Sequence, residues 1–117
     1  MIKVKIARDK QGFIWGFTIK GHAGYKKRGE DIVCAGVSAI AYTAVGALSE
    51  MAGVGDYVEK DGYMKCNIQS NLDDNLKQTV KIILETMVIG LKQIENSYKE
   101  YVVVENVLPH SHDFSHG

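Results

Sequence analysis

The stretch DDNLKQTVKIILETMVIGLKQIENSY, residues 73–98, decides the fold because its apolar residues repeat with helical spacing. They recur in steps of three or four, at Leu76, Val80, Ile83, Met87, Leu91, Ile94 and Tyr98. This spacing places them on one side of an α-helix. We therefore predict a long amphipathic helix that begins near Asp73 and needs other elements to cover its apolar side.

The segments before this helix alternate in the way that strands do. An N-terminal β-hairpin is predicted over residues 2–20, where apolar residues share faces at Ile2, Val4, Ile6 and then at Phe13, Trp15, Phe17, Ile19. A second hairpin is predicted around the turn pair Asp61-Gly62, with inward side chains at Met64, Cys66 and Ile68. YVVVENV, residues 101–107, predicts a last strand.

Between the hairpins, residues 32 to about 51 are apolar or small almost all round. This predicts a second helix, buried on several sides. The resulting order, ββαββαβ, is typical of a single α+β domain in which two helices pack on a mainly antiparallel sheet. We assign this domain to residues 1–107 and expect residues 108–117, which are polar and rich in histidine, to form a flexible C-terminal tail.

Composition narrows the class of protein. A chain of 117 residues with 45% hydrophobic residues is long enough to bury one core. Because 14 basic and 14 acidic residues balance, the broad positive field of a general nucleic-acid binder is not expected. The alternating N-terminal strand resembles neither a signal peptide nor a membrane anchor. We expect a cytoplasmic protein whose two cysteines are thiols.

The two cysteines have different settings. Cys66 shares a strand face with apolar residues, which favours a buried, structural thiol. Cys34 lies in the first turn of the predicted helix, where Asp31 is a good N-cap and amide N–H groups have no helical partner. Such groups lower the pKa of a thiol and can hold an oxyanion. Simple packing of Cys34 remains an alternative.

His22 is the one histidine outside the tail, and it stands between Gly21 and Gly24 on a loop that leads to Cys34. Flexible glycine backbone lets such a loop approach other groups closely. A Cys–His pair supplies a thiolate nucleophile and a general acid, the minimum needed to hydrolyse a peptide bond. Two ligands are too few for a metal site, and we expect no metal or cofactor.

Neighbouring residues have two readings each. Asp31 either only caps the helix or also orients His22. Ser38, one helical turn after Cys34, either hydrogen-bonds near the thiol or bonds back to the carbonyl four residues earlier. The basic run KKR, residues 26–28, is either a solvated loop surface or a substrate contact.

GHAGY at 21–25, followed by GEDIVCAGVSA at 29–39, strongly resembles the Prp family of ribosomal-processing cysteine proteases, and the resemblance extends over residues 1 to about 107. It implies a homodimer that removes an N-terminal extension from large-subunit ribosomal protein L-twenty-seven. It also implies Cys34 as the nucleophile, His22 as its proton-transfer partner, and Asp31 and Ser38 as supporting residues. The loop at residues 21–30 would be mobile, with the three glycines Gly21, Gly24 and Gly29 as hinges.

An alternative of another class is a ribosome- or RNA-associated binding module without catalysis. In that reading Cys34 only packs, and YKKRG at residues 25–29 contacts phosphate. Binding would then weaken steeply with salt. The resemblance to a peptidase gives no expectation of direct nucleic-acid binding, nor of a membrane.

Overall fold

The computed structural model describes residues 1–27 and 31–109 of the chain. Most of the expected flexible tail, from residue 110 on, lies outside the described residues. The elements are β1 (Ile2–Arg8), β2 (Ile14–Lys20), α1 (Ile32–Ala47), the π-helical turn η1 (Leu48–Ala52), β3 (Asp56–Lys60), β4 (Tyr63–Asn67), α2 (Asp74–Ser97) and β5 (Val102–Val107). The predicted ββαββαβ order is confirmed.

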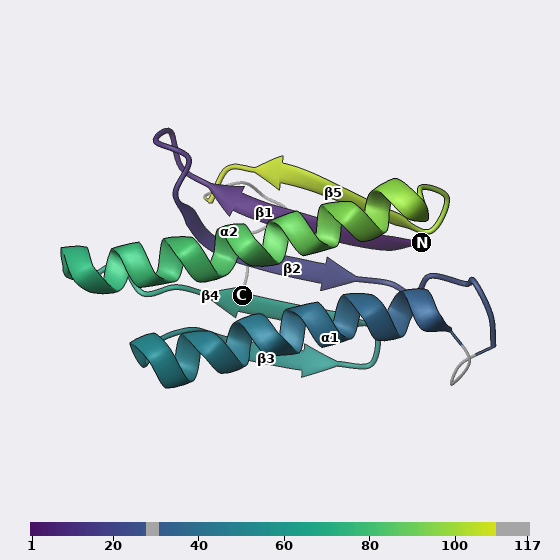
Figure 1. Ribbon diagram of the computed structural model, residues 1–117, viewed down its shortest axis with the longest axis horizontal. Helices are drawn as coiled ribbons and strands as arrows, with labels where there is room; N and C mark the ends of the chain where they lie inside the picture. The colour runs from purple at the N-terminus through teal and green to yellow at the C-terminus, as the bar shows by residue number, and fades with distance from the viewer. Residues whose placement is uncertain (28–30, 110–117) are drawn as a thin grey trace.

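The five strands form one sheet in the order β3-β4-β2-β1-β5. Only β1 and β5 run parallel, and the other three neighbouring pairs are antiparallel. Both helices lie on the same face of this sheet, with α1 over β3 and β4 and α2 nearer β1 and β2 (Figure 1). This confirms an α+β domain with two helices on a mainly antiparallel sheet.

The core lies between the sheet and the helices. Its fully buried side chains come from both layers: Val4, Ile6 and Phe17 from the sheet, and Val80, Leu84 and Leu91 from α2. Cys66 is fully buried among them, as its strand pattern predicted. Burial raises the pKa of the Cys66 thiol to about 12. This cysteine is therefore a packing residue that stays protonated.

The β1–β2 hairpin departs from strict alternation near its turn. Arg8 pairs with Ile14 after a shift in register, so Trp15 is the extra residue of a β-bulge. As a result Ile14 is buried, whereas Phe13 and Trp15 are only half-buried. The bulge therefore adds Ile14 to the core, while Phe13 and Trp15 still pack against the core as predicted, beneath Lys77 of α2.

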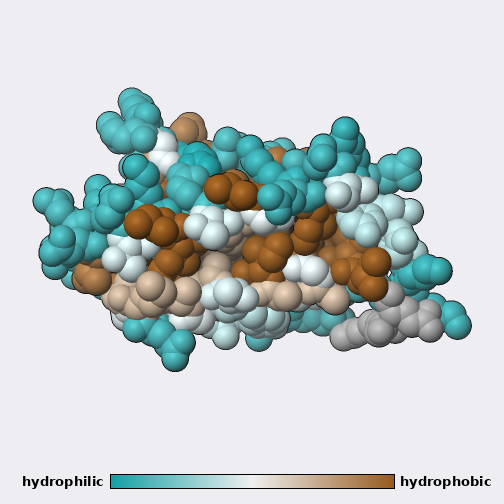
Figure 2. Space-filling view, viewed as in Figure 1, coloured by the Kyte–Doolittle hydropathy of each residue, from teal (hydrophilic) through white to brown (hydrophobic). Residues whose placement is uncertain are grey.

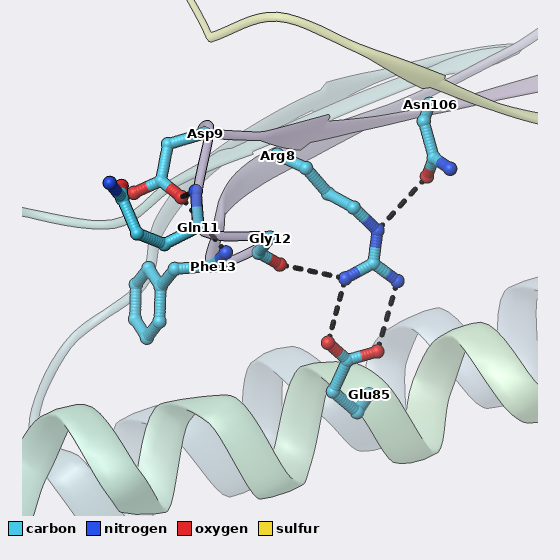
Figure 3. A network of polar contacts seen from close by, with 7 residues as sticks. All are labelled: Arg8, Asp9, Gln11, Gly12, Phe13, Glu85 and Asn106. Carbon is cyan, nitrogen blue, oxygen red and sulfur yellow. Dashed lines mark hydrogen bonds and ion pairs between the residues drawn. The ribbon is translucent and has the colours of Figure 1, made fainter.

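Arg8 fastens this end of the sheet to α2 (Figure 3). Its guanidinium donates to both carboxylate oxygens of Glu85, at 2.7 and 2.9 Å. It also donates to the side chain of Asn106 at 3.0 Å and to the carbonyl of Gly12 at 2.9 Å. Planar, two-pronged bonds of this kind fix geometry as well as adding energy. One side chain thus joins β1, the β1–β2 turn, α2 and β5.

Asp9 organises the turn itself. Its carboxylate accepts hydrogen bonds from the N–H groups of Gln11 and Phe13, at 2.9 and 3.0 Å. It also accepts one from the indole N–H of Trp15 at 2.8 Å. These bonds, the Trp15 indole donation first among them, hold the pKa of Asp9 below its usual value. We call this region, with Arg8, Asp9, Gly12, Trp15 and Glu85, the turn end of the sheet.

Helix α1 is buried along one side only, through Val33, Val37, Ala41, Ala44 and Val45. Its prediction as a helix buried on several sides is wrong for the single chain, because Ile32 and Tyr42 are 58% and 46% exposed. The sheet lies beneath one side of α1 (Figure 1), and α2 packs along one flank. By length and composition alone, Ile32–Ala52 could also cross a membrane, a test that a core helix passes equally well.

Candidate active site

Three segments meet at the end of the sheet opposite the turn end. They are the loop after β2, the start of α1 and the β3–β4 turn, all on the right of Figure 1. Between them lies a groove of about 880 Å³. Its lining includes the candidate residues Gly21, His22, Gly24, Asp31, Cys34 and Ser38. Gly29, the third predicted hinge, lies outside the described residues.

Cys34 is half-buried in the first turn of α1. Its Sγ accepts a hydrogen bond from the backbone N–H of Ala23 at 3.2 Å. Ala23 follows His22 directly and is itself buried, at 4% exposure. The histidine-bearing loop is therefore fastened to the sulfur through its main chain.

Asp31 caps α1 and ties the loop to it. One carboxylate oxygen accepts the N–H groups of Val33 and Cys34, each at 3.0 Å. The other accepts the N–H of Tyr25 at 3.2 Å. Partial burial opposes ionisation, yet these N–H groups outweigh it and hold the pKa of Asp31 below its ordinary value. The anion at the helix start is therefore this carboxylate.

The pKa of the Cys34 thiol is shifted in the direction opposite to the one that its place at a helix start predicted. Burial raises its pKa, and the Asp31 carboxylate raises it further, although the Ala23 N–H acts in the opposite direction. The expected lowering is wrong because burial is the largest influence on the thiol, and because Asp31 takes the helix N–H groups that would have stabilised a thiolate. For the same reason the amides of Val33 and Cys34 are not open to an oxyanion.

His22 is held by its main chain and projects an open ring. Its carbonyl accepts a hydrogen bond from the amino group of Met1 at 2.7 Å. Gly21 and Gly24 beside it adopt positive φ angles of 101° and 71°. The side chain is 58% exposed, and its Nε2 lies 3.9 Å from Oδ1 of Asp61. Sequence reasoning treated Asp61 only as a turn residue, since nothing in the chain links it to a histidine so far away.

The groove continues along α1 away from the thiol. Ser38 lines it one turn after Cys34, and Tyr42 one turn later. The Tyr42 hydroxyl donates to the carboxylate of Glu59, which joins α1 to β3 and raises the pKa of the tyrosine. Eight residues of helix span ~12 Å. That length accommodates about three or four residues of extended peptide.

No group of three His, Cys, Asp or Glu side chains within residues 1–27 and 31–109 is arranged to hold a metal ion. The side chains that line the groove include a thiol, an imidazole and the carboxylates of Asp31, Glu59 and Asp61. A thiol and an imidazole that line the same groove can act as nucleophile and proton carrier when they meet.

Comparison with known proteins shows the family of the chain. The family model described as cysteine protease Prp matches residues 1–103. The ribosomal processing cysteine protease Prp of Bacillus subtilis is 34% identical over 112 residues, covering 92% of this chain and 100% of the relative. The Prp of Staphylococcus aureus strain Mu50 is 32% identical over 107 residues, covering 87% and 95%.

Solved structures agree with the sequences. The S. aureus protease Prp in complex with a covalently linked product peptide superposes with a TM-score of 0.83 at 29% identity, covering 92% of this chain and 100% of that one. Its complex with a substrate peptide gives 0.76 at 28% identity, with the same coverage. With a matching fold and family model, the chain belongs to the Prp family of ribosomal-processing cysteine proteases.

Proposed function

We propose that this chain is a cytoplasmic endopeptidase that removes the N-terminal extension of ribosomal protein L-twenty-seven. In this proposal Cys34 is the nucleophile and His22 is its proton-transfer partner. The observation that carries it is the 3.2 Å hydrogen bond from Ala23 N–H to the Cys34 sulfur, which brings the residue next to His22 onto the thiol. The S. aureus relative bound to a substrate peptide supports a peptide as the ligand of the groove.

The pKa of Cys34 is raised above its ordinary value, so the proposed reaction starts from the neutral thiol. The resting thiol is protonated, so the His22 imidazole takes its proton as the sulfur attacks the scissile carbonyl carbon. The imidazolium then gives that proton to the leaving amine while the C–N bond breaks and a thioester remains. A water molecule, deprotonated by the imidazole, hydrolyses the thioester and releases the acid. The sulfur recovers a proton from the imidazolium.

Supporting roles follow from the contacts. Asp31 positions both the loop and the helix start through its three N–H bonds. Ser38 and Tyr42 line the path that an extended substrate would take along α1. The Ala23 N–H must leave the sulfur when a carbonyl carbon approaches, and we assign this movement to the loop, with Gly21 and Gly24 as hinges.

The test is cleavage of the L-twenty-seven precursor, followed by mass spectrometry of the product. Cys34→Ala and His22→Ala should each abolish shortening of the precursor. Cys66→Ala is the matched control, because it removes the other thiol from the core and not from the groove. Undiminished cleavage by Cys34→Ala would contradict the mechanism. An intact precursor with the wild-type protein would contradict the assigned substrate.

We also propose that the chain forms a homodimer through the outer side of its helices. No charged residue occurs from Ile32 to Ser49, although much of that segment is exposed. Ile82 and Ile89, seven residues apart on α2, are 58% and 60% exposed. Figure 2 shows hydrophobic side chains gathered over both helices. An apolar area of this kind favours a protein partner.

The oligomeric state can be measured by light scattering on a sizing column. A dimer is expected for the wild type, and Ala39→Glu, on the exposed side of α1, should give monomers. Gln69→Glu adds the same charge in an exposed loop and should remain dimeric. A monomeric wild type at high concentration would contradict the homodimer.

A further inference from the structure

The β3–β4 turn brings a carboxylate to His22. Asp61 Oδ1 lies 3.9 Å from His22 Nε2, although the two residues belong to segments far apart in the chain. Their side chains are 62% and 58% exposed. A pair as exposed as this adds little to folding stability. Its placement beside the thiol's partner points to a role in chemistry.

Gly62 makes this placement specific. Its φ is +72°, and a Cβ added there would lie 2.8 Å from His22 Nε2 and 3.3 Å from Cε1. The imidazole therefore rests directly against the bare backbone of the turn. The Gly62 carbonyl also accepts the N–H of Gly21 at 2.8 Å. The same turn thus fixes the backbone before His22 and supports its ring.

Asp31, the other residue considered for orienting His22, already uses its carboxylate elsewhere. Asp31 uses both carboxylate oxygens on backbone N–H groups, those of Tyr25, Val33 and Cys34. The Asp61 carboxylate lies 3.9 Å from His22 Nε2, and the two form an ion pair once the imidazole is protonated. The two carboxylates therefore have different positions: Asp31 caps the helix that carries Cys34, and Asp61 faces the imidazole of His22.

We propose that Asp61 is a positioning residue for His22, a proposal that rests on the function proposed above. Its negative charge, 3.9 Å away, favours the neutral tautomer with the proton on Nε2 and leaves the lone pair of Nδ1 for the Cys34 thiol. When Nδ1 accepts the thiol proton, the Asp61 carboxylate stabilises the imidazolium. Nδ1 then returns that proton to the leaving amine. A bound peptide that displaces water would strengthen this pairing.

The experiment compares Asp61→Ala, Asp61→Glu and a control, Asp56→Ala, which removes an exposed carboxylate from the far end of the same hairpin. With a peptide that spans the cleavage site, Asp61→Ala should lower kcat by about 10- to 100-fold and leave KM within about twofold. Asp61→Glu should recover most of the loss. Asp56→Ala should behave as the wild type.

Two further readouts need no cleavage. Nitrogen NMR of the His22 ring should show the Nε2–H tautomer in the wild type and a mixture of tautomers in Asp61→Ala, with signals assigned by their loss in His22→Ala. Alkylation of Cys34 by iodoacetamide should slow several-fold in Asp61→Ala. These readouts still decide the role of Asp61 if the wild type fails to cleave the precursor, a failure that counts against the proposed function alone.

Three results would overturn the positioning role. The first is a wild-type kcat in Asp61→Ala. The second is a lower kcat with unchanged tautomer and alkylation rate, because the turn would then act only on structure. The third is an Nδ1–H tautomer in the wild type.

Discussion

The two ends of the sheet are held together in different ways. At the turn end, charged side chains do the holding, through the Arg8–Glu85 pair and the Asp9 carboxylate. At the groove end, main-chain groups supply the donors: Ala23 N–H bonds to the Cys34 sulfur, Gly21 N–H bonds to the Gly62 carbonyl, and three further N–H groups bond to the Asp31 carboxylate. The groove end thereby leaves the His22 side chain open while its backbone is fixed. Because main-chain hydrogen bonds hold the loop, the imidazole of His22 remains free to take part in a reaction.

The largest expected loss of stability comes from replacing a glycine at one end of the sheet, and it should differ between the two ends. Gly12 at the turn end and Gly21 at the groove end both have positive φ, +86° and +101°. A Cβ at Gly12 would meet nothing within 4 Å, whereas one at Gly21 would lie 2.3 Å from the Met1 carbonyl oxygen. Gly12→Ala should therefore cost about 1 kcal/mol of unfolding free energy from backbone strain alone, and Gly21→Ala about 3 kcal/mol. Urea denaturation measures both. Equal losses of unfolding free energy would show that the Met1 carbonyl can move away from an added Cβ at Gly21 at no cost.

Breaking the turn end should cost less. Arg8→Ala removes four hydrogen bonds and leaves Glu85 without its partner. Because the pair is partly exposed, we expect a loss of about 1–2 kcal/mol in unfolding free energy, with cleavage unchanged. Lys10→Ala, at an exposed position of the same turn, is the control. Reduced cleavage in folded Arg8→Ala would mean that the two ends are coupled.

This loss should depend on pH. The hydrogen bond and charge of Arg8 lower the pKa of Glu85 in the folded protein from its ordinary value of 4.5. The stabilisation is therefore present above pH 4.5 and disappears as the pH falls through the folded pKa. Wild type and Arg8→Ala should converge in acid, as denaturation curves at several pH values would show.

The smallest expected effect concerns the charge beside Cys34. Asp31→Asn keeps a good N-cap but removes the negative charge that helps to raise the pKa of the thiol. The thiolate should then form at lower pH, and alkylation at pH ~7.5 should be about two- to fivefold faster. Asp73→Asn makes the same change at the N-cap of α2 and should leave the rate unchanged. A slower reaction in Asp31→Asn would contradict the direction given for Cys34.

Local pattern predicted the elements well. The period of α2 gave its apolar side, and Asp73 and Tyr98 are its caps. The Asp61-Gly62 pair gave the second turn, since the two strands it joins end at Lys60 and begin at Tyr63. These features depend on neighbours along the chain, which is why the order of elements and the antiparallel pairing could be predicted.

Contacts between distant segments could not be predicted. The bulge at Trp15 depends on how β1 and β2 pair, which alternation alone does not reveal. The pKa of Cys34 depends on how far the assembled domain buries the thiol and on Asp31, whose carboxylate takes the helix N–H groups. The approach of Asp61 to His22 depends on the β3–β4 turn reaching the loop after β2. Each is a property of the assembled sheet.

The burial of Cys66 has a practical consequence for following the groove end in solution. With its pKa near 12, this thiol should stay silent toward labelling reagents at neutral pH, so a dye attached to the protein reports on Cys34 alone. The single tryptophan, Trp15, belongs to the turn end at the other side of the sheet. Energy transfer from its indole to a dye on Cys34 would therefore span both ends. The chain therefore needs no added tryptophan or cysteine for a distance measurement that follows movement of the loop.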